Sequence, residues 1–199
     1  MKIKVCGLKY PDNINEVAAL QPDYVGFIFY PQSPRFAGEF EMVDVPAIKT
    51  GVFVNESAER IGDAIARYKL GAIQLHGSEG PEFCEQFKGK VTVIKAFGVD
   101  ENFDFEQLNE FEDSVDYFLF DTKTSKHGGS GQTFNWNLLD QYKLSVPFLL
   151  SGGLSLDNLE EVKKIRHPQF YGVDLNSRFE IEPGLKDIDK LTKAFKILR

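Results

Sequence analysis

The sequence predicts one α/β domain over residues 1–199, in which eight parallel strands close into a (β/α)8 barrel. Short apolar runs recur along the chain, and segments with apolar residues at helical spacing separate them. Eight such runs can be counted, and regular alternation of strand with helix is typical of a parallel sheet. The length of 199 residues is near the lower limit for this architecture, the TIM barrel.

The strand candidates are short segments that are apolar or that alternate between polar and apolar residues. The first alternates and stops at Gly7, whereas the second is apolar on both faces, as a buried parallel strand requires. In chain order the eight candidates cover residues 3–6, 24–29, 50–54, 72–75, 91–96, 117–120, 148–150 and 172–175.

Helical patterns fill most of the intervals between these strands. They cover residues 12–20, 57–68, 81–87, 157–162 and 186–198, and the second of them opens with the capping residue Ser57. Residues 37–47, between the second and third strands, are a poor helix because they hold Gly38, β-branched residues and Pro46. We therefore expect the second helix of the barrel, which this interval should supply, to be short or irregular. The Gly-, Ser- and Thr-rich loop from Lys123 to Thr133 is longer than most connections of this kind.

Composition and charge exclude several classes of protein. The formal net charge of −7 argues against non-specific binding to nucleic acid or to an anionic membrane. No apolar run approaches membrane-spanning length, and no signal peptide precedes the first strand. The two cysteines, Cys6 and Cys84, are not expected to form a disulfide, and metal-ligand spacing is absent. The expected compartment is therefore the reducing cytoplasm.

A thiol and a carboxyl group end two of the predicted strands. Cys6 closes the first strand, and Asp121 directly follows the apolar residues 118–120 of the sixth. A free cysteine in a strand is usually a small buried hydrophobe, and an aspartate at a strand exit often forms a turn or cap. At the catalytic end of a barrel, however, the thiol can act as a base, and burial can keep the carboxyl protonated as an acid.

Further candidates follow the second, seventh and eighth strands. Gly152 and Gly153 follow the seventh strand, where barrels that bind phosphosugars hold phosphate with backbone N–H groups, although a plain tight turn has the same sequence. Arg35 lies in a loop stiffened by two prolines and can bind a carboxylate through two hydrogen bonds. The end of the eighth strand supplies Asp174, Asn176 and Ser177.

Taken together, these motifs resemble those of the phosphoribosylanthranilate isomerase family of tryptophan biosynthesis, over nearly the whole chain. Each motif alone is weak evidence, whereas their common order is specific. They are Lys4-Val5-Cys6-Gly7, Gly26-Phe27-Ile28-Phe29 before Ser33-Pro34-Arg35, Gly51-Val52-Phe53-Val54-Asn55, Gln74-Leu75-His76-Gly77, Asp121-Thr122-Lys123 before Gly128-Gly129-Ser130-Gly131, Phe134-Asn135-Trp136, Ser151-Gly152-Gly153-Leu154 and Pro183-Gly184-Leu185-Lys186-Asp187.

The resemblance implies an Amadori rearrangement of N-(5-phosphoribosyl)anthranilate to 1-(2-carboxyphenylamino)-1-deoxyribulose 5-phosphate, without metal or cofactor. It implies Cys6 as general base, Asp121 as general acid and Arg35 as the residue that holds the anthranilate carboxylate. It also places the phosphate against Gly152, Gly153 and the turn at Asn176 and Ser177. For the assembly we expect a monomer or a homodimer.

Two motifs depart from the family pattern. The eighth loop reads Asn176-Ser177-Arg178 where a glycine is usual, which questions the backbone geometry of the phosphate site. Asn135 replaces the more usual aspartate at a predicted helix cap.

Three rival functions use the same fold. A metal-dependent epimerase needs His and Asp ligands at strand ends, where only His76 is available. The related isomerase of histidine biosynthesis has an aspartate in place of Cys6. A barrel that only binds a phosphometabolite requires neither Cys6 nor Asp121.

Overall fold

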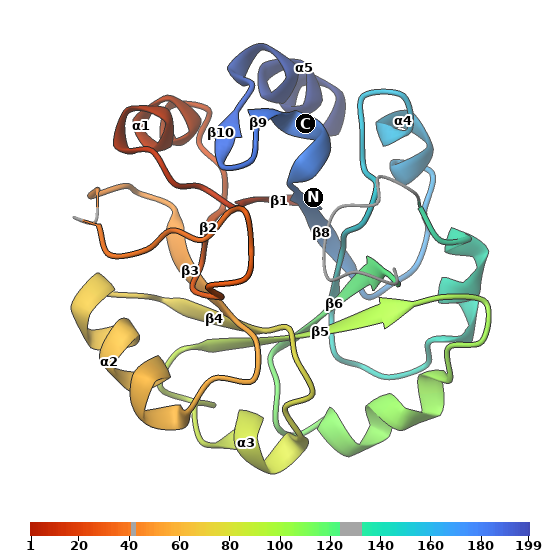
Figure 1. Ribbon diagram of the computed structural model, residues 1–199. Helices are drawn as coiled ribbons and strands as arrows, with labels where there is room; N and C mark the ends of the chain where they lie inside the picture. The colour runs from red at the N-terminus through yellow and green to blue at the C-terminus, as the bar shows by residue number, and fades with distance from the viewer. Residues whose placement is uncertain (41–42, 124–132) are drawn as a thin grey trace.

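The strands form a closed barrel with helices around it in the computed structural model, which describes residues 1–40, 43–123 and 133–199 (Figure 1). The barrel strands follow one another in chain order, every neighbouring pair is parallel, and the last pairs with the first. The predicted fold class is therefore confirmed. The strands are β1 (Lys2–Cys6), β2 (Tyr24–Ile28), β3 (Ile48–Phe53), β4 (Ala72–Leu75), β5 (Thr92–Val99), β6 (Tyr117–Thr122), β7 (Phe148–Leu150) and β8 (Phe170–Leu175).

The helices that cover the barrel differ in length. Ser57 caps the second of them by accepting a hydrogen bond from Arg60 N, as its sequence predicts. Asn135 caps the 3₁₀ segment that follows it in the same way. The cap is therefore kept although asparagine replaces the more usual aspartate. The helices are α1 (Pro11–Ala19), α2 (Ala58–Tyr68), α3 (Pro81–Glu85), α4 (Leu159–Val162) and α5 (Ile188–Leu198), and 3₁₀ segments cover Phe105–Phe111, Trp136–Gln141 and Ser177–Phe179.

The connection between β2 and β3 is irregular, as predicted. Its described residues, 29–40 and 43–47, form no helix. Phe36 instead forms an isolated bridge with Ile28, and Ala37 N donates to Ile28 O. Phe40 then packs its ring against Phe27, so aromatic contacts cover this part of the barrel in place of a helix.

A small hairpin replaces the start of the helix predicted over residues 186–198. β9 (Glu180–Glu182) pairs antiparallel with β10 (Leu185–Lys186), and α5 begins two residues later, capped by Asp187. The cause is a reciprocal pair of hydrogen bonds between Asn13 of α1 and the backbone of Lys186. The backbone of Lys186 is therefore fixed in the hairpin.

Alternation along the strands divides the buried side chains into two sets. Ile3 and Val5 of β1 belong to the core between the strands and the helices, so Lys4 and Cys6 face the inside of the barrel. Apolar side chains fill the inside along β5 to β7, whereas buried polar side chains line it near β1, β3, β4 and β8. The apolar set is Ile94, Ala96, Leu119 and Leu149, and the polar set is Lys4, Thr50, Gln74 and Asp174.

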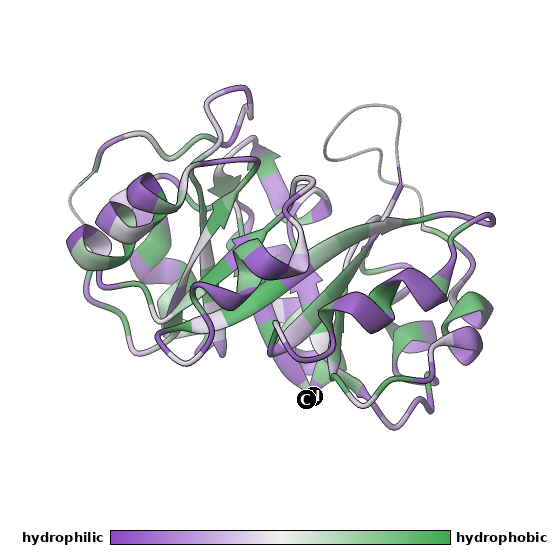
Figure 2. Ribbon diagram, turned by 90° about the horizontal axis from the view of Figure 1, so that it is seen from below, coloured by the Kyte–Doolittle hydropathy of each residue, from purple (hydrophilic) through white to green (hydrophobic). Residues whose placement is uncertain are grey.

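The side view separates the two ends of the barrel. Apolar strands run through the middle, and the helices turn their polar faces outward (Figure 2). Both termini lie together at the amino end of the strands. The opposite end, formed by the carboxyl ends of the strands, is where sites occur in this architecture.

Candidate active site

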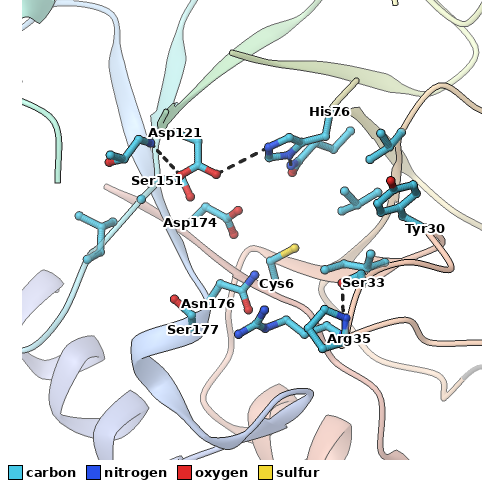
Figure 3. Close-up of a pocket in the computed structure, with 18 of the residues that line it drawn as sticks. Cys6, Tyr30, Ser33, Arg35, His76, Asp121, Ser151, Asp174, Asn176 and Ser177 are labelled. Carbon is cyan, nitrogen blue, oxygen red and sulfur yellow. Dashed lines mark hydrogen bonds and ion pairs between the residues drawn. The ribbon is translucent and has the colours of Figure 1, made fainter. Parts of the chain in front are cut away.

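The carboxyl ends of the strands enclose one cavity that collects the predicted site residues (Figure 3). Residues of β1, β2, β3, β4, β6 and β8 and of the loops after β2 and β7 line it. The Gly128–Gly131 motif lies outside the described residues. The predicted residues in the cavity lining are Cys6, Arg35, Asp121, Gly152, Gly153, Asp174, Asn176 and Ser177.

Cys6 is the last residue of β1, and its side chain is almost fully buried. Gly26 on the neighbouring strand makes room for it, because a Cβ at Gly26 would lie 2.7 Å from the Cys6 Sγ. Burial raises the pKa of the thiol, and the Lys4 ammonium opposes that shift. Lys4, rather than Arg35, is therefore the principal cationic neighbour of the sulfur.

Asp121 belongs to β6 itself, which ends at Thr122, whereas the sequence predicts a strand that ends at Phe120. Its Oδ1 accepts a hydrogen bond from Thr122 N at 2.8 Å, and its Oδ2 lies 3.6 Å from His76 Nε2. Burial, followed by the negative charge of Asp174, raises the pKa of Asp121 from 3.8 to about 6. A carboxyl group in this state can serve as a proton donor near neutral pH.

His76 is oriented toward Asp121 by its other ring nitrogen. Gln74 Nε2 lies 2.7 Å from His76 Nδ1. The other ring nitrogen, Nε2, faces the carboxyl group of Asp121. His76 lines the same cavity, at the end of the fourth strand where the sequence predicts it.

Gly152 brings the loop after β7 into contact with the end of β6. Its φ of +82° favours glycine, and a Cβ there would lie 2.4 Å from Thr122 N and 2.6 Å from Asp121 Oδ1. Gly153 also has a positive φ, of +66°. Gly152 is therefore required for the close approach to Asp121, whatever the loop itself binds.

Arg35 is held by a carboxylate from the β9–β10 hairpin. Its Nε and Nη2 donate to Glu180 Oε2 at 2.9 and 2.7 Å. These two hydrogen bonds occupy one edge of the guanidinium. The outer edge, formed by Nη1 and Nη2, is the one that can take a second carboxylate. Arg35 is thus fixed in orientation at the cavity wall.

A buried lysine links this clamp to the end of β8. Lys186 Nζ donates to Glu180 Oε1 at 2.7 Å and to Asn176 Oδ1 at 2.8 Å. The side-chain oxygen of Asn176 is therefore used within the protein, and Asn176 and Ser177 both line the cavity.

Sequence reasoning missed Glu180 and Lys186. Lys4 could be recognised as a neighbour of the thiol, since it is two residues from Cys6 on the same face of a strand, and the structure shows it fully buried. Glu180 and Lys186 had no such signal, because only the folded hairpin brings them to Arg35.

Both cysteines are free thiols, and Cys84 is buried in α3 away from the cavity lining. Among the described residues, no group of three or more His, Cys, Asp or Glu side chains has the arrangement of a metal site. Within the same ranges, no helix combines the length and the apolar character needed to cross a membrane.

A (β/α)8 barrel with an acidic carboxyl group and a thiol at its mouth is typical of enzymes that move protons between carbon and oxygen atoms. The family model described as N-(5'phosphoribosyl)anthranilate (PRA) isomerase matches residues 3–197. The chain therefore belongs to the N-(5'-phosphoribosyl)anthranilate isomerase family.

Relatives of that name are similar over almost their full length. The protein of Parabacteroides distasonis is 50% identical, over 96% of this chain and 90% of the relative. The protein of Phocaeicola vulgatus is 46% identical, over 94% and 92%. The family expected from the sequence motifs is confirmed.

Solved structures of the family share the fold. The phosphoribosyl anthranilate isomerase of Thermotoga maritima has a TM-score of 0.85 and 33% identity, with 100% of this chain and 98% of that chain covered. A second isomerase structure, in complex with reduced 1-(o-carboxyphenylamino)-1-deoxyribulose 5-phosphate, has a TM-score of 0.81 and 29% identity, with the same coverage.

Proposed function

We propose that this chain converts N-(5-phosphoribosyl)anthranilate to 1-(2-carboxyphenylamino)-1-deoxyribulose 5-phosphate in tryptophan biosynthesis, with Asp121 as general acid and Cys6 as general base. The observation that carries the proposal is a carboxyl group with a pKa of about 6 in the same cavity as a buried thiol. Family membership and the complex of the structural relative support the choice of substrate.

The reaction requires two proton transfers on neighbouring atoms of the sugar. Asp121 protonates the furanose ring oxygen, the bond between C1 and that oxygen breaks, and a Schiff base forms between C1 and the anthranilate nitrogen. The Cys6 thiolate then removes the proton from C2, which gives an enolamine. Loss of the O2 proton and protonation of C1 complete the ketone, so the product is an isomer of the substrate. These reaction steps require an acid and a base but no cofactor.

The cavity wall around Arg35 suits the anthranilate group. Its free edge is directed away from Glu180 and matches a carboxylate geometrically. Apolar side chains at the ends of β2 and β3 line the same cavity and suit the aromatic ring. These apolar residues are Ile28, Val52 and Val54.

Two loops of the cavity wall suit the phosphate group. Gly152 and Gly153, both with positive φ, and the turn at Asn176 and Ser177 expose backbone to the cavity. Backbone N–H groups in such turns bind phosphate on acidic proteins as well as on basic ones. The Asn176-Ser177-Arg178 sequence then requires no glycine at position 178.

The test generates the substrate in situ from anthranilate and phosphoribosyl pyrophosphate and follows the loss of its fluorescence. We expect Cys6→Ala to abolish turnover and to retain most of the affinity for product, because the thiol removes a proton and binds little. We expect Asp121→Asn to lose ring opening. Near-normal turnover of either variant would overturn the role assigned to that residue.

The compartment and the assembly remain expectations. We expect the protein in the cytoplasm, as a monomer or a homodimer; one structural relative is described as monomers generated from the dimeric Thermotoga maritima enzyme. Light scattering after size-exclusion chromatography distinguishes the two assemblies.

A further inference from the structure

A buried ion pair lies within the barrel beside the two groups assigned as base and acid. Lys4 Nζ is 2.9 Å from Asp174 Oδ2, and both side chains are at most 5% exposed. The two residues are direct partners in the register where β1 meets β8. The proton transfers proposed for Cys6 and Asp121 do not use this pair.

The two ends of the pair have different neighbours. Lys4 precedes Cys6 by two residues on β1, so both side chains leave the same face of the strand. The carboxyl group of Asp174 lies between Cys6 and Asp121 in the cavity (Figure 3). Its Oδ1 is buried and has no hydrogen-bond partner within the described ranges, so no donor offsets the charge on that oxygen.

We propose that Lys4 and Asp174 are positioning residues whose ion pair favours the thiolate of Cys6 with its positive end and the protonated form of Asp121 with its negative end. The proposal rests on the roles assigned to Cys6 and Asp121 in the proposed function. A pair of opposite charges can lower the pKa of one neighbour and raise that of another. A single charge would shift both pKa values in the same direction.

The electrostatic effects have the signs that this arrangement requires. Burial contributes most to the raised pKa of Cys6, and the Lys4 charge, which lowers it, outweighs the Asp174 charge, which raises it. Burial also contributes most to the raised pKa of Asp121, where the Asp174 charge outweighs the Lys4 charge. The pair thus lowers the pKa of the base and raises that of the acid.

Lys4 keeps its charge over the pH range of interest. Burial lowers the pKa of its ammonium, but the Asp174 carboxylate and the Cys6 sulfur raise it by more, so that the pKa lies above its ordinary value of 10.5. Two further groups face this cluster. Lys186, from β10, lowers the pKa of Cys6 and opposes the rise that burial causes in the pKa of Asp174, and His76, after β4, faces Asp121.

The decisive variant removes both charges together, as Lys4→Met with Asp174→Leu, so that no unpaired buried charge is left. Two readouts follow the groups themselves. The pH dependence of iodoacetamide alkylation, located at Cys6 by mass spectrometry, reports its thiolate. The ¹³C NMR shift of the Asp121 carboxyl carbon reports its protonation. Lys4→Arg, which keeps the charge, is the matched control.

In the double variant we expect the titration midpoint of Cys6 to move to higher pH and that of Asp121 to move to lower pH. In Lys4→Arg both midpoints should stay near those of the wild type. If the double variant only loosened the fold and admitted water, both titration midpoints would move down toward their ordinary values, and the proposal would be overturned. Two unchanged midpoints would overturn it as well. If the double variant does not fold, Lys4→Met alone must move both midpoints up, and any other movement of Cys6 refutes the proposal.

These outcomes are separable from those that test the proposed function. The two midpoints are measured without turnover, so they remain informative if Cys6→Ala keeps its activity and the base is reassigned. Conversely, unmoved midpoints together with an inactive Cys6→Ala would refute the ion-pair proposal alone.

Discussion

The substitution Asp121→Asn should stabilise the protein at neutral pH while it abolishes turnover. The folded state raises the pKa of this carboxyl group from 3.8 to about 6, a difference of about 2 pH units. At about 1.36 kcal/mol per unit, ionised Asp121 costs at most about 3 kcal/mol of folding free energy above pH 6, and less to the extent that its 24% exposed side chain is screened by water. Asparagine removes that cost and still offers an oxygen to Thr122 N.

The sign of the effect gives it a characteristic pH dependence. Below pH 3.8 the carboxyl group is protonated in both the folded and the unfolded state, so its charge contributes no difference. Between 3.8 and about 6 the wild type loses stability relative to the variant as pH rises, and above about 6 the difference is constant. Urea unfolding of both proteins across this range, followed by circular dichroism, measures the difference.

Asp23→Asn is the matched control, because its charge has the opposite effect. Burial raises the pKa of Asp23, but hydrogen bonds from Lys2 and from Ile3 N outweigh burial and lower it. Its ionised form therefore stabilises the fold, and Asp23→Asn should destabilise the protein at neutral pH. Equal stability of wild type and Asp121→Asn at pH 5 and pH 8, or a loss in the variant at both, would refute the burial argument for Asp121.

Other consequences can be tested with single substitutions. Arg35→Ala should raise KM by about ten- to a hundredfold, since a charged hydrogen bond contributes about 1.5–3 kcal/mol, and an unchanged KM would mean that the carboxylate binds elsewhere. Glu180→Gln should raise KM less than Arg35→Ala and leave kcat nearly unchanged in steady-state kinetics, because it loosens the guanidinium without removing it. Gly152→Ala should lower both the urea midpoint and kcat, because its Cβ would clash with Thr122 N; Ile181→Ala, at an exposed position, is the neutral control.

Local patterns were sufficient to predict the barrel and most of its candidate site. The predicted bounds of β4 and β7 agree with the observed strands, because each is a short apolar run between polar or turn residues. Cys6 and Asp121 were recognisable because parallel strands in one barrel bring their carboxyl ends together. That single topological rule places residues 115 positions apart in one cavity.

The supporting residues depend on contacts that no local pattern contains. Residue 186 reads as helical, yet Asn13 binds its backbone and holds it in a hairpin. A lysine such as Lys4 within a strand ordinarily indicates a solvent-exposed face, and its partner Asp174 comes from the far end of the chain. Asp121 was expected just beyond a strand, whereas pairing with Gly98 on β5 extends the ladder to include it.

The seam between β1 and β8 joins the first and the last strand of the barrel. Lys4 and Asp174 are 170 residues apart, so their contact requires these two strands to pair and the ring to close. A chain still lacking β8 would hold Cys6 and Asp121 without the pair between them. Recovery of turnover during refolding should therefore lag behind the recovery of helical circular dichroism, and activity serves as a reporter of ring closure.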